Sequence, residues 1–154
     1  MRVLVIYAHP DPESINGAIH REVMSSLSEA GHEVDDLDLY AEGFDPVLSA
    51  EERQNYFEPD LNRVRVAGYA ARIGAADGLV FCFPTWCLGP PAILKGFFDR
   101  VMVPGVSFRL EEDGSLSPNL RHIKRVTAVV AYGRGRGILR WFGDPPRRLM
   151  PRYI

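Results

Sequence analysis

Apolar residues gather along the chain in short runs, separated by segments with a longer repeat. Near-continuous apolar runs cover residues 2–7 and 78–83, which predicts strands buried on both faces of a parallel sheet. Residues 125–131 form a further apolar run that predicts another strand. Residues 32–39 alternate apolar side chains with acids, a pattern typical of a more exposed strand. The chain is therefore expected to contain four strands.

Three segments between these runs have the spacing of amphipathic helices. They cover residues 15–30, 66–76 and 92–102. Gly31 follows the first segment, where glycine commonly ends a helix. Pro91 opens the third segment, and we expect it at the first helical position, where the missing N–H of proline is tolerated.

Strands that alternate with helices predict the doubly wound α/β class, in which right-handed crossovers join the strands of a parallel sheet. Residues 40–65 interrupt this alternation, because they contain Gly43, Pro46 and Pro59 and show little periodicity. Such a long connection is often functional. No internal repeat, low-complexity tract or linker divides the sequence, so we expect residues 1–154 to form a single domain.

Composition excludes several classes of protein. Of the 154 residues, 46% are hydrophobic and the formal net charge is only −2, which excludes a disordered chain. Two cysteines are too few for a disulfide scaffold or a structural zinc site, and we expect no metal. No apolar run approaches the roughly 20 residues of a membrane-spanning helix, and the N-terminus does not resemble a signal peptide. We therefore expect a cytoplasmic protein without a membrane span.

Charge is unevenly distributed between the two ends of the chain. Residues 1–120 contain 9 Lys or Arg and 19 Asp or Glu, a net charge of −10, whereas residues 121–154 contain 9 and 1, a net charge of +8. A basic tail can contact a phosphate, a nucleic acid or the acidic body of the same protein. It contains no nucleic-acid-binding motif, so we expect no nucleic-acid partner and instead consider contacts with the phosphate of NADPH. The arginines that cluster in this tail are Arg134, Arg136, Arg140, Arg147, Arg148 and Arg152, and we expect some of them, such as Arg134 or Arg136, to contact that phosphate.

The loop after the first strand is a candidate phosphate site. Ligands of doubly wound sheets lie beyond the carboxyl ends of the strands. Ser14, Ile15 and Asn16 stand where the following helix begins, so Ser14 or Asn16 can cap the helix and its free N–H groups can hold a phosphate. His9 in the same loop can donate to a ligand. In the alternative interpretation Ser14 is only a helix cap and His9 only packs in the loop.

A second candidate loop, residues 84–91, follows the third apolar run. Its three prolines restrict the backbone, and Gly89 permits close approach of another group. Trp86, Cys87 and Leu88 lie in this loop, which suits a flat and partly apolar ligand with polar edges. The alternative is that Trp86 is an ordinary core aromatic. No base that would activate Cys87 as a nucleophile is identifiable, so we interpret it as part of the wall of the site.

Three motifs give the chain a family resemblance. The first motif is Ala8-His9-x-x-x-x-Ser14-x-Asn16-x-Ala18. The second is Asp38-Leu39-Tyr40 followed by Phe44-Asp45-Pro46. The third, and the most specific, is Phe83-Pro84-x-x-x-x-Gly89-x-Pro91-Ala92-Ile93-Leu94-Lys95-Gly96-x-Phe98-Asp99-Arg100-Val101. Over about residues 2–150 the sequence resembles the flavodoxin-like NAD(P)H:quinone oxidoreductases, the DT-diaphorase family.

The resemblance implies a flavodoxin-like sheet with strand order 2-1-3-4-5, an FAD or FMN cofactor and a homodimer. It also implies two-electron hydride transfer from NADH or NADPH to a quinone or similar acceptor. The positions that would hold the flavin phosphates and ribityl chain are His9, Ser14, Ile15, Asn16 and Ala18. The positions that would line the flavin ring are Pro84, Thr85, Trp86, Cys87 and Leu88.

Two features depart from the family pattern. A Thr-Thr-Gly-Gly loop commonly follows the fourth strand in the family, whereas this chain has Ala131-Tyr132-Gly133-Arg134. The N–H groups of Tyr132 and Gly133 are the candidates for stabilising negative charge on the flavin, and the Tyr132 hydroxyl either donates to an acceptor or is simply solvated. Family members also continue through another helix and a fifth strand, which we expect this chain to lack.

One further function is consistent with the resemblance. Some relatives resemble ancillary proteins of ion-efflux systems, so the alternative is a flavin-binding regulatory subunit with little or no turnover.

Overall fold

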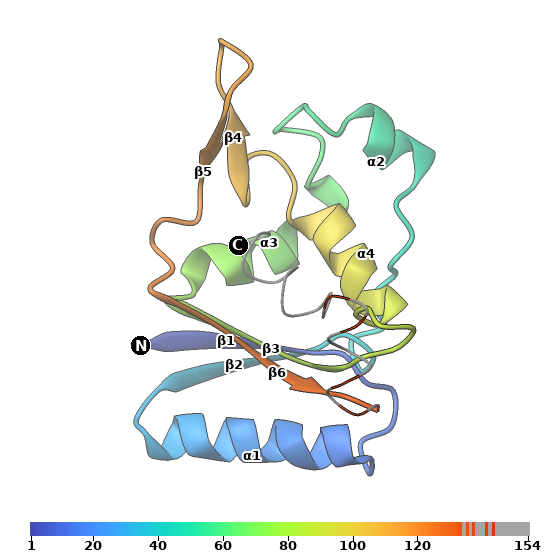
Figure 1. The fold of residues 1–154 in the computed structure, drawn as a ribbon. Coiled ribbons are helices and arrows are strands. Elements are labelled where there is room, and N and C mark those ends of the chain that lie inside the picture. The colour runs from blue at the N-terminus through green and yellow to red at the C-terminus, as the bar shows by residue number, and fades with distance from the viewer. Residues whose placement is uncertain (134, 136, 138–140, 142, 144–154) are drawn as a thin grey trace.

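Four parallel strands form the central sheet of the protein (Figure 1). The computed structural model describes residues 1–133, 135, 137, 141 and 143. The sheet has the order β2-β1-β3-β6, and its strands are β1 (Arg2–Tyr7), β2 (Glu33–Asp38), β3 (Gly78–Pro84) and β6 (Arg125–Ala131). Since β6 is the fourth strand of this sheet along the chain, the predicted flavodoxin-like order 2-1-3-4 is confirmed for the described residues.

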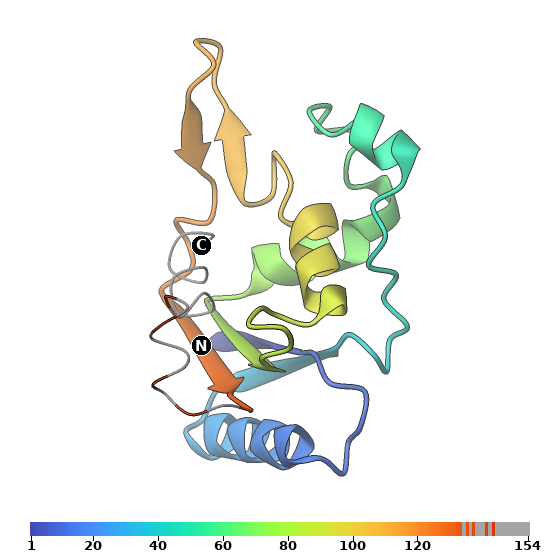
Figure 2. The same cartoon turned by 45° about the vertical axis from the view of Figure 1, so that its right-hand side comes forward.

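Helices cover both faces of the sheet, as Figures 1 and 2 show. The helix α1 (Ile15–Glu29) lies on one face, while α3 (Ala67–Ala75) and α4 (Ala92–Val101) lie on the other. No helix among the described residues combines the length and the apolar character needed to cross a membrane. The arrangement is the doubly wound α/β architecture expected from the alternation of strands and helices.

Side chains of β1 alternate between two apolar clusters. Val3 and Val5 face α1, whereas Leu4 and Ile6 join the larger cluster on the side of α3 and α4. Every residue of β3 is buried, as expected for a strand covered on both faces. In β2 only Leu37 is buried, which confirms the expectation of a more exposed strand.

The ends of the predicted helices are close to those observed. Gly31, with a φ of 76°, follows the end of α1 in the left-handed conformation that glycine adopts without strain. Pro91 is one residue earlier than expected: with φ −54° and ψ 149° it is the N-cap of α4, and Ala92 is the first helical residue. Its backbone is extended, so the helix begins only after it.

Several short elements were not predicted from the periodicity. Residues 40–66 include α2 (Ala50–Gln54) and a 3₁₀ turn, η1 (Val64–Val66). Between α4 and β6 the chain forms an antiparallel hairpin of β4 (Phe108–Leu110) and β5 (Leu116–Pro118), which projects away from the sheet in Figures 1 and 2. Elements of three to five residues are too short to show a repeat.

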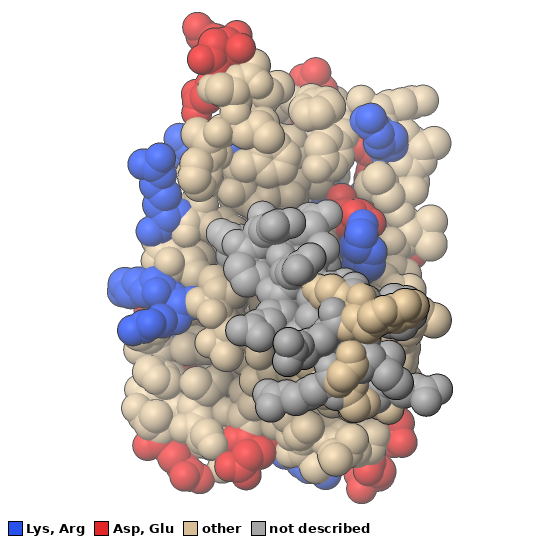
Figure 3. All heavy atoms as spheres, viewed as in Figure 1, with Lys and Arg blue, Asp and Glu red and all other residues tan. Residues whose placement is uncertain are grey.

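On the face shown in Figure 3, acidic side chains are prominent over α1, at the bottom of the view, and at the tip of the hairpin. The hairpin tip contains Glu111, Glu112 and Asp113, which are all exposed. This distribution agrees with the net negative charge expected for residues 1–120.

A buried ion pair attaches α2 to α4. Arg100 donates from Nε and Nη2 to Oε1 of Glu52, over 2.9 Å and 2.6 Å, and each side chain is only 8% exposed. Arg100 also donates to the carbonyl of Asp45, and its guanidinium lies 5.6 Å from the centre of the Phe44 ring. The segment that precedes α3 is thereby held against the last turn of α4.

The second carboxylate oxygen of Glu52 completes a capping box. The Ser49 N–H donates to Glu52 Oε2 over 2.9 Å, while the Glu52 N–H donates to Ser49 Oγ over 3.2 Å. Burial acts to raise the pKa of Glu52, but the hydrogen bonds from Ser49 and Arg100 outweigh burial, and the pKa lies below its ordinary value of 4.5. The ionised form of Glu52 is therefore favoured by folding.

We predict that Glu52→Gln lowers the free energy of unfolding near neutral pH by about 1–3 kcal/mol, because Arg100 keeps a buried charge without its counter-charge. Since the folded-state pKa of Glu52 is depressed, this stabilisation is present above pH 4.5 and is lost as the pH falls through the folded-state value. The difference between variant and wild type in urea unfolding should therefore shrink at acidic pH.

The matched control for this experiment is Glu51→Gln on the same helix. Glu51 pairs with Arg65 over 2.6 Å, but the two side chains are 65% and 59% exposed. An exposed pair contributes little to stability, so this variant should unfold like wild type. An equal loss of stability in both variants would contradict the role given to the buried pair.

Candidate functional site

The loops that follow β1, β3 and β6 meet at one edge of the sheet. The Ala8 N–H donates to the Cys82 carbonyl over 3.1 Å, and the Thr85 N–H donates to the Ala131 carbonyl over 2.8 Å. These bonds continue the strand pairing to the carboxyl ends of the strands, at the right of the sheet in Figure 1. Ligands of doubly wound sheets bind at this edge.

A network of short contacts shapes the first loop. Ser14 is the N-cap of α1: its Oγ accepts from the Gly17 N–H over 3.1 Å and donates to the Asp11 carbonyl over 2.6 Å. The Asp11 N–H donates to Nδ1 of His9 over 3.1 Å. Nδ1 also lies 3.0 Å from the Asp11 carbonyl oxygen and 3.0 Å from Ser14 Oγ, so this ring nitrogen is engaged within the loop in either tautomer. The capping role considered for Ser14 is confirmed, and Nε2 is the nitrogen of His9 that can be directed to a ligand.

Gly17 allows the loop to pack closely on the start of α1. A Cβ atom at this position would lie 1.9 Å from the carbonyl oxygen of Pro12. The first N–H groups of a helix have no partner within the helix, and those of Ile15 and Asn16 belong to this first turn. The close packing therefore fixes the loop around a helix N-terminus that can accept an anion.

The second loop contains a tight turn with strained backbone. Trp86 and Gly89 exchange two backbone hydrogen bonds of 3.0 Å, which close a two-residue turn. Its central residues, Cys87 and Leu88, have φ values of 49° and 66°, and neither is a glycine. Two positive φ values are characteristic of a type I′ turn, and a non-glycine residue in this region costs on the order of 1 kcal/mol or more. Such strain is concentrated at functional sites.

The structure brings the two loops together. The rings of His9 and Trp86 lie 5.8 Å apart between centroids, at 59° to each other, and Trp86 is 43% exposed. The exposure of Trp86 is inconsistent with the alternative that it is a core aromatic. Polar donors from one loop and an exposed indole from the other therefore border the same part of the sheet edge.

The remaining predicted positions differ in their surroundings. Pro84 is the buried last residue of β3, and Asn16 is also buried, whereas the side chains of Ile15 and Ala18 are exposed on α1. Tyr132 and Gly133 follow β6 directly and are exposed. Arg134 lies outside the described residues, as do the other arginines that cluster in the basic tail, which are Arg136, Arg140, Arg147, Arg148 and Arg152.

The two cysteines differ in their exposure to solvent. Cys82 is buried in β3, and burial raises the pKa of its thiol to about 11. It therefore stays protonated near neutral pH and is not a nucleophile. Cys87 is exposed in the tight turn.

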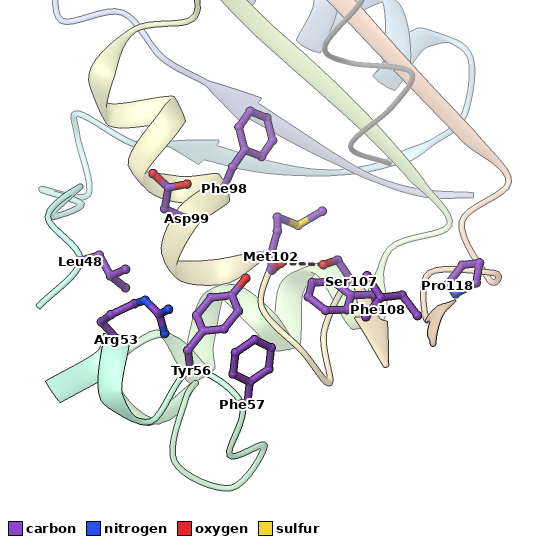
Figure 4. Close-up of a pocket in the computed structure, with 11 residues that line it drawn as sticks. Leu48, Arg53, Tyr56, Phe57, Phe98, Asp99, Met102, Ser107, Phe108 and Pro118 are labelled. Atoms are coloured by element: carbon purple, nitrogen blue, oxygen red, sulfur yellow. Dashed lines mark hydrogen bonds between the residues drawn. The ribbon is translucent and has the colours of Figure 1, made fainter. Parts of the chain in front are cut away.

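A separate groove lies between the segment around α2, the second half of α4 and the hairpin. It encloses about 670 Å³, and Figure 4 shows Tyr56 and Phe57 on one side of Met102 with Phe108 on the other. Its lining residues are Leu48, Arg53, Tyr56, Phe57, Phe98, Asp99, Met102, Ser107, Phe108, Leu116 and Pro118. This groove was not predicted from the sequence, since the walls beside α4 belong to loops and short elements without a hydrophobic repeat.

The fold and the edge site together define a doubly wound α/β protein whose first loop, after β1, surrounds a helix N-terminus that can accept an anion. Residues 1–144 match the model of the protein family described as the flavodoxin-like fold, and the chain belongs to this family. An NAD(P)H:quinone oxidoreductase from Methanothermobacter marburgensis has a similar structure. Its TM-score is 0.84 and its identity 31%, over 94% of this chain and 73% of that chain.

Curated relatives are similar over shorter stretches. A ribosyldihydronicotinamide dehydrogenase-like protein of Penicillium crustosum is 37% identical over 127 residues, which cover 73% of this chain and 48% of that protein. The NAD(P)H dehydrogenase [quinone] 1 of Rattus norvegicus is 31% identical over 123 residues, 70% of this chain and 45% of that protein. The chain thus spans about half the length of these relatives. The resemblance found in the sequence motifs is confirmed.

We predict that Gly17→Ala lowers the free energy of unfolding by about 1–3 kcal/mol, because the new Cβ displaces the backbone of Pro12. The matched control is Gly68→Ala in the first turn of α3, where no other group lies within 4 Å of the added atom. That variant should unfold at the same or higher urea concentration, since alanine has less freedom in the unfolded chain. Equal unfolding midpoints for the two variants would contradict the close packing of the loop.

Proposed function

We propose that this protein is a flavin-dependent NAD(P)H:quinone oxidoreductase built on a single flavin-binding domain. It would transfer a hydride from NADH or NADPH, through FMN or FAD, to a quinone or similar acceptor. The observation that carries the proposal is the meeting of the His9–Ser14 loop with the Trp86 loop at the carboxyl edge of the sheet. The names of the similar proteins, which are NAD(P)H oxidoreductases, support the same activity.

The phosphate end of the cofactor fits the start of α1. The N–H groups of Ile15 and Asn16 are donors without a charge of their own, and Nε2 of His9 joins them when it carries the ring proton. An anionic phosphate shared by FMN and FAD is a suitable acceptor for such a set at a helix N-terminus. Asp11 and Glu13 are exposed on the outside of the loop, where they can point away from the phosphate.

The ring end of the cofactor fits the second loop. Trp86 and Leu88 offer apolar surface, while Pro84, Thr85 and Cys87 complete the wall. The strained turn fixes the direction of these side chains before a ligand binds, which reduces the entropy lost on binding. When bound, a flavin supplies the hydride chemistry, so the protein has to orient the reactants and exclude water.

Negative charge that develops on the flavin ring during the reaction needs hydrogen-bond donors on the side of the ring opposite the second loop. We assign this role to the N–H groups of Tyr132 and Gly133, which follow the β6 residue that pairs with Pro84. Backbone donors held at a strand end act without reorganisation, which is the basis of electrostatic stabilisation in active sites. Tyr132 can also donate its hydroxyl to the acceptor.

We predict that the purified protein binds FMN or FAD with a visible absorption band, that NADPH or NADH bleaches this band anaerobically and that a quinone restores it. The expected steady-state pattern is ping-pong, because both substrates use the same face of the cofactor. A bound flavin that neither nucleotide reduces would favour the alternative of a regulatory subunit. Absence of flavin binding after reconstitution would contradict both functions.

Assembly as a homodimer is part of the same proposal. The groove beside α4 is bordered by apolar side chains that are exposed in one chain: Phe57 is 53% exposed and Leu116 is 65% exposed. A large apolar surface of this kind is typical of a protein interface. Arg53 stacks over Tyr56 at 5.7 Å, which adds one of the residue types that are enriched at interfaces.

We predict that light scattering during size exclusion gives twice the chain mass of 17.3 kDa and that Leu116→Asp reduces it to a single chain. A carboxylate in an apolar interface loses its hydration without gaining a partner. Ser25→Asp on α1, on the opposite face of the sheet, is the control and should stay dimeric. A dimer that survives Leu116→Asp would place the interface elsewhere.

A further inference from the structure

Tyr7 is the last residue of β1 and directly precedes the first loop. The residue is only 2% exposed, and its ring stacks on that of His20 with 4.1 Å between centroids and 5° between planes. His20 is itself fixed by a contact of 2.9 Å between Nε2 and the Asp36 carboxylate. The phenol ring therefore has a fixed position between the sheet and α1.

The hydroxyl group of Tyr7 is buried without a hydrogen bond. No described residue is in hydrogen-bonding geometry with it. Burial raises the pKa of this phenol, so it is a neutral donor near neutral pH. The negative charges of Asp38 and Asp11 also raise the pKa of Tyr7, whereas the neighbouring Ser14 hydroxyl, a hydrogen-bonding group, lowers it. An unsatisfied buried donor is costly, which calls for a partner in some state of the protein.

Ser14 has the capacity to be this partner. Its hydroxyl has a single proton, which goes to the Asp11 carbonyl, and one of its two lone pairs accepts from the Gly17 N–H. Ser14 Oγ also lies 3.0 Å from Nδ1 of His9. When the His9 ring carries its proton on Nε2, Nδ1 does not donate to this oxygen, and one lone pair of Ser14 remains for Tyr7. The Tyr7 oxygen has almost no accessible surface, so a ligand outside the loop cannot reach it directly. Any influence of Tyr7 on a ligand therefore passes through Ser14.

We infer that Tyr7 is a positioning residue for the phosphate group of the cofactor. When a phosphate lies at the start of α1, the Ser14 hydroxyl turns its proton from the Asp11 carbonyl to the phosphate. Tyr7 then donates to Ser14 Oγ, which satisfies the buried phenol and strengthens Ser14 as a donor. This inference rests on the proposed flavin-binding function and concerns the phosphate only.

The test compares a flavin that has the phosphate with one that lacks it. Dissociation constants for FMN and riboflavin are measured by fluorescence with the flavin-free wild type and the Tyr7→Phe variant. Preference for FMN over riboflavin should fall by about three- to tenfold in the variant, the range expected for one hydrogen bond. In a Ser14→Ala background, Tyr7→Phe should cause no further loss, because its route to the phosphate is already absent.

The Tm of the flavin-free protein shows whether Tyr7 acts as a positioning residue or has a purely structural role. Tyr7→Phe removes an unsatisfied donor and keeps the stacked ring, so its Tm should equal or exceed that of wild type. Tyr69→Phe is the matched control: Tyr69 contacts Phe44 at 5.1 Å on the other face of the sheet, and its loss of a hydroxyl should not change the preference for FMN. A lower Tm for Tyr7→Phe, or equal weakening of FMN and riboflavin, would overturn the inference.

The effect of inorganic phosphate on the Tm tests the role of Tyr7 independently of flavin binding. If wild type binds neither flavin, the proposed function fails, but inorganic phosphate should still raise the Tm of wild type more than that of Tyr7→Phe. An identical effect of phosphate on the two proteins would overturn the role of Tyr7 by itself. Binding of both flavins with an unchanged preference would overturn it while leaving the proposed function in place.

Discussion

Parallel pairing of β1 with β3 is the interaction on which the site depends. The register joins Tyr7 to Cys82, so the two strands end at the same edge of the sheet. Parallel strands require crossovers that return over the faces of the sheet, which places α1 after the first loop and α4 after the second. Two loops more than 70 positions apart in sequence are therefore neighbours, and each is followed by the start of a helix.

The long connection before α3 supports the second loop from the far end of α4. Gly96 lies so close to this connection that a Cβ atom would be 2.2 Å from the Pro46 carbonyl oxygen. One turn later, Arg100 reaches the buried carboxylate of Glu52. Helix α4 is thus held in place at Gly96 and at Arg100, and the turn at Cys87 and Leu88 lies directly before this rigidly held helix. This anchoring explains how the strained turn is maintained without glycine.

Long periodic segments made the sheet and its three main helices predictable, and the loop motifs identified the edge site. The pairing of Arg100 with Glu52 was not predicted, because a short helix has no periodicity and a buried charge looks like an exposed one in sequence. Two local signals were available: Ser49 and Glu52 have the spacing of a capping box, and Asp113-Gly114 is a hairpin turn. Tyr7 resembled any apolar strand residue, since only packing shows that its hydroxyl is unpaired.

The strand order also affects how the chain is made. The strands β1 and β2 leave the ribosome early, whereas β3 begins only at Gly78 and β6 only at Arg125. Throughout that interval the inner edge of β1 has no neighbour, and an uncovered apolar edge is where nascent chains associate with each other. Slower synthesis before Gly78 would prolong this exposure, while β3, once made, closes the edge and brings the first two loops of the site together in the same event.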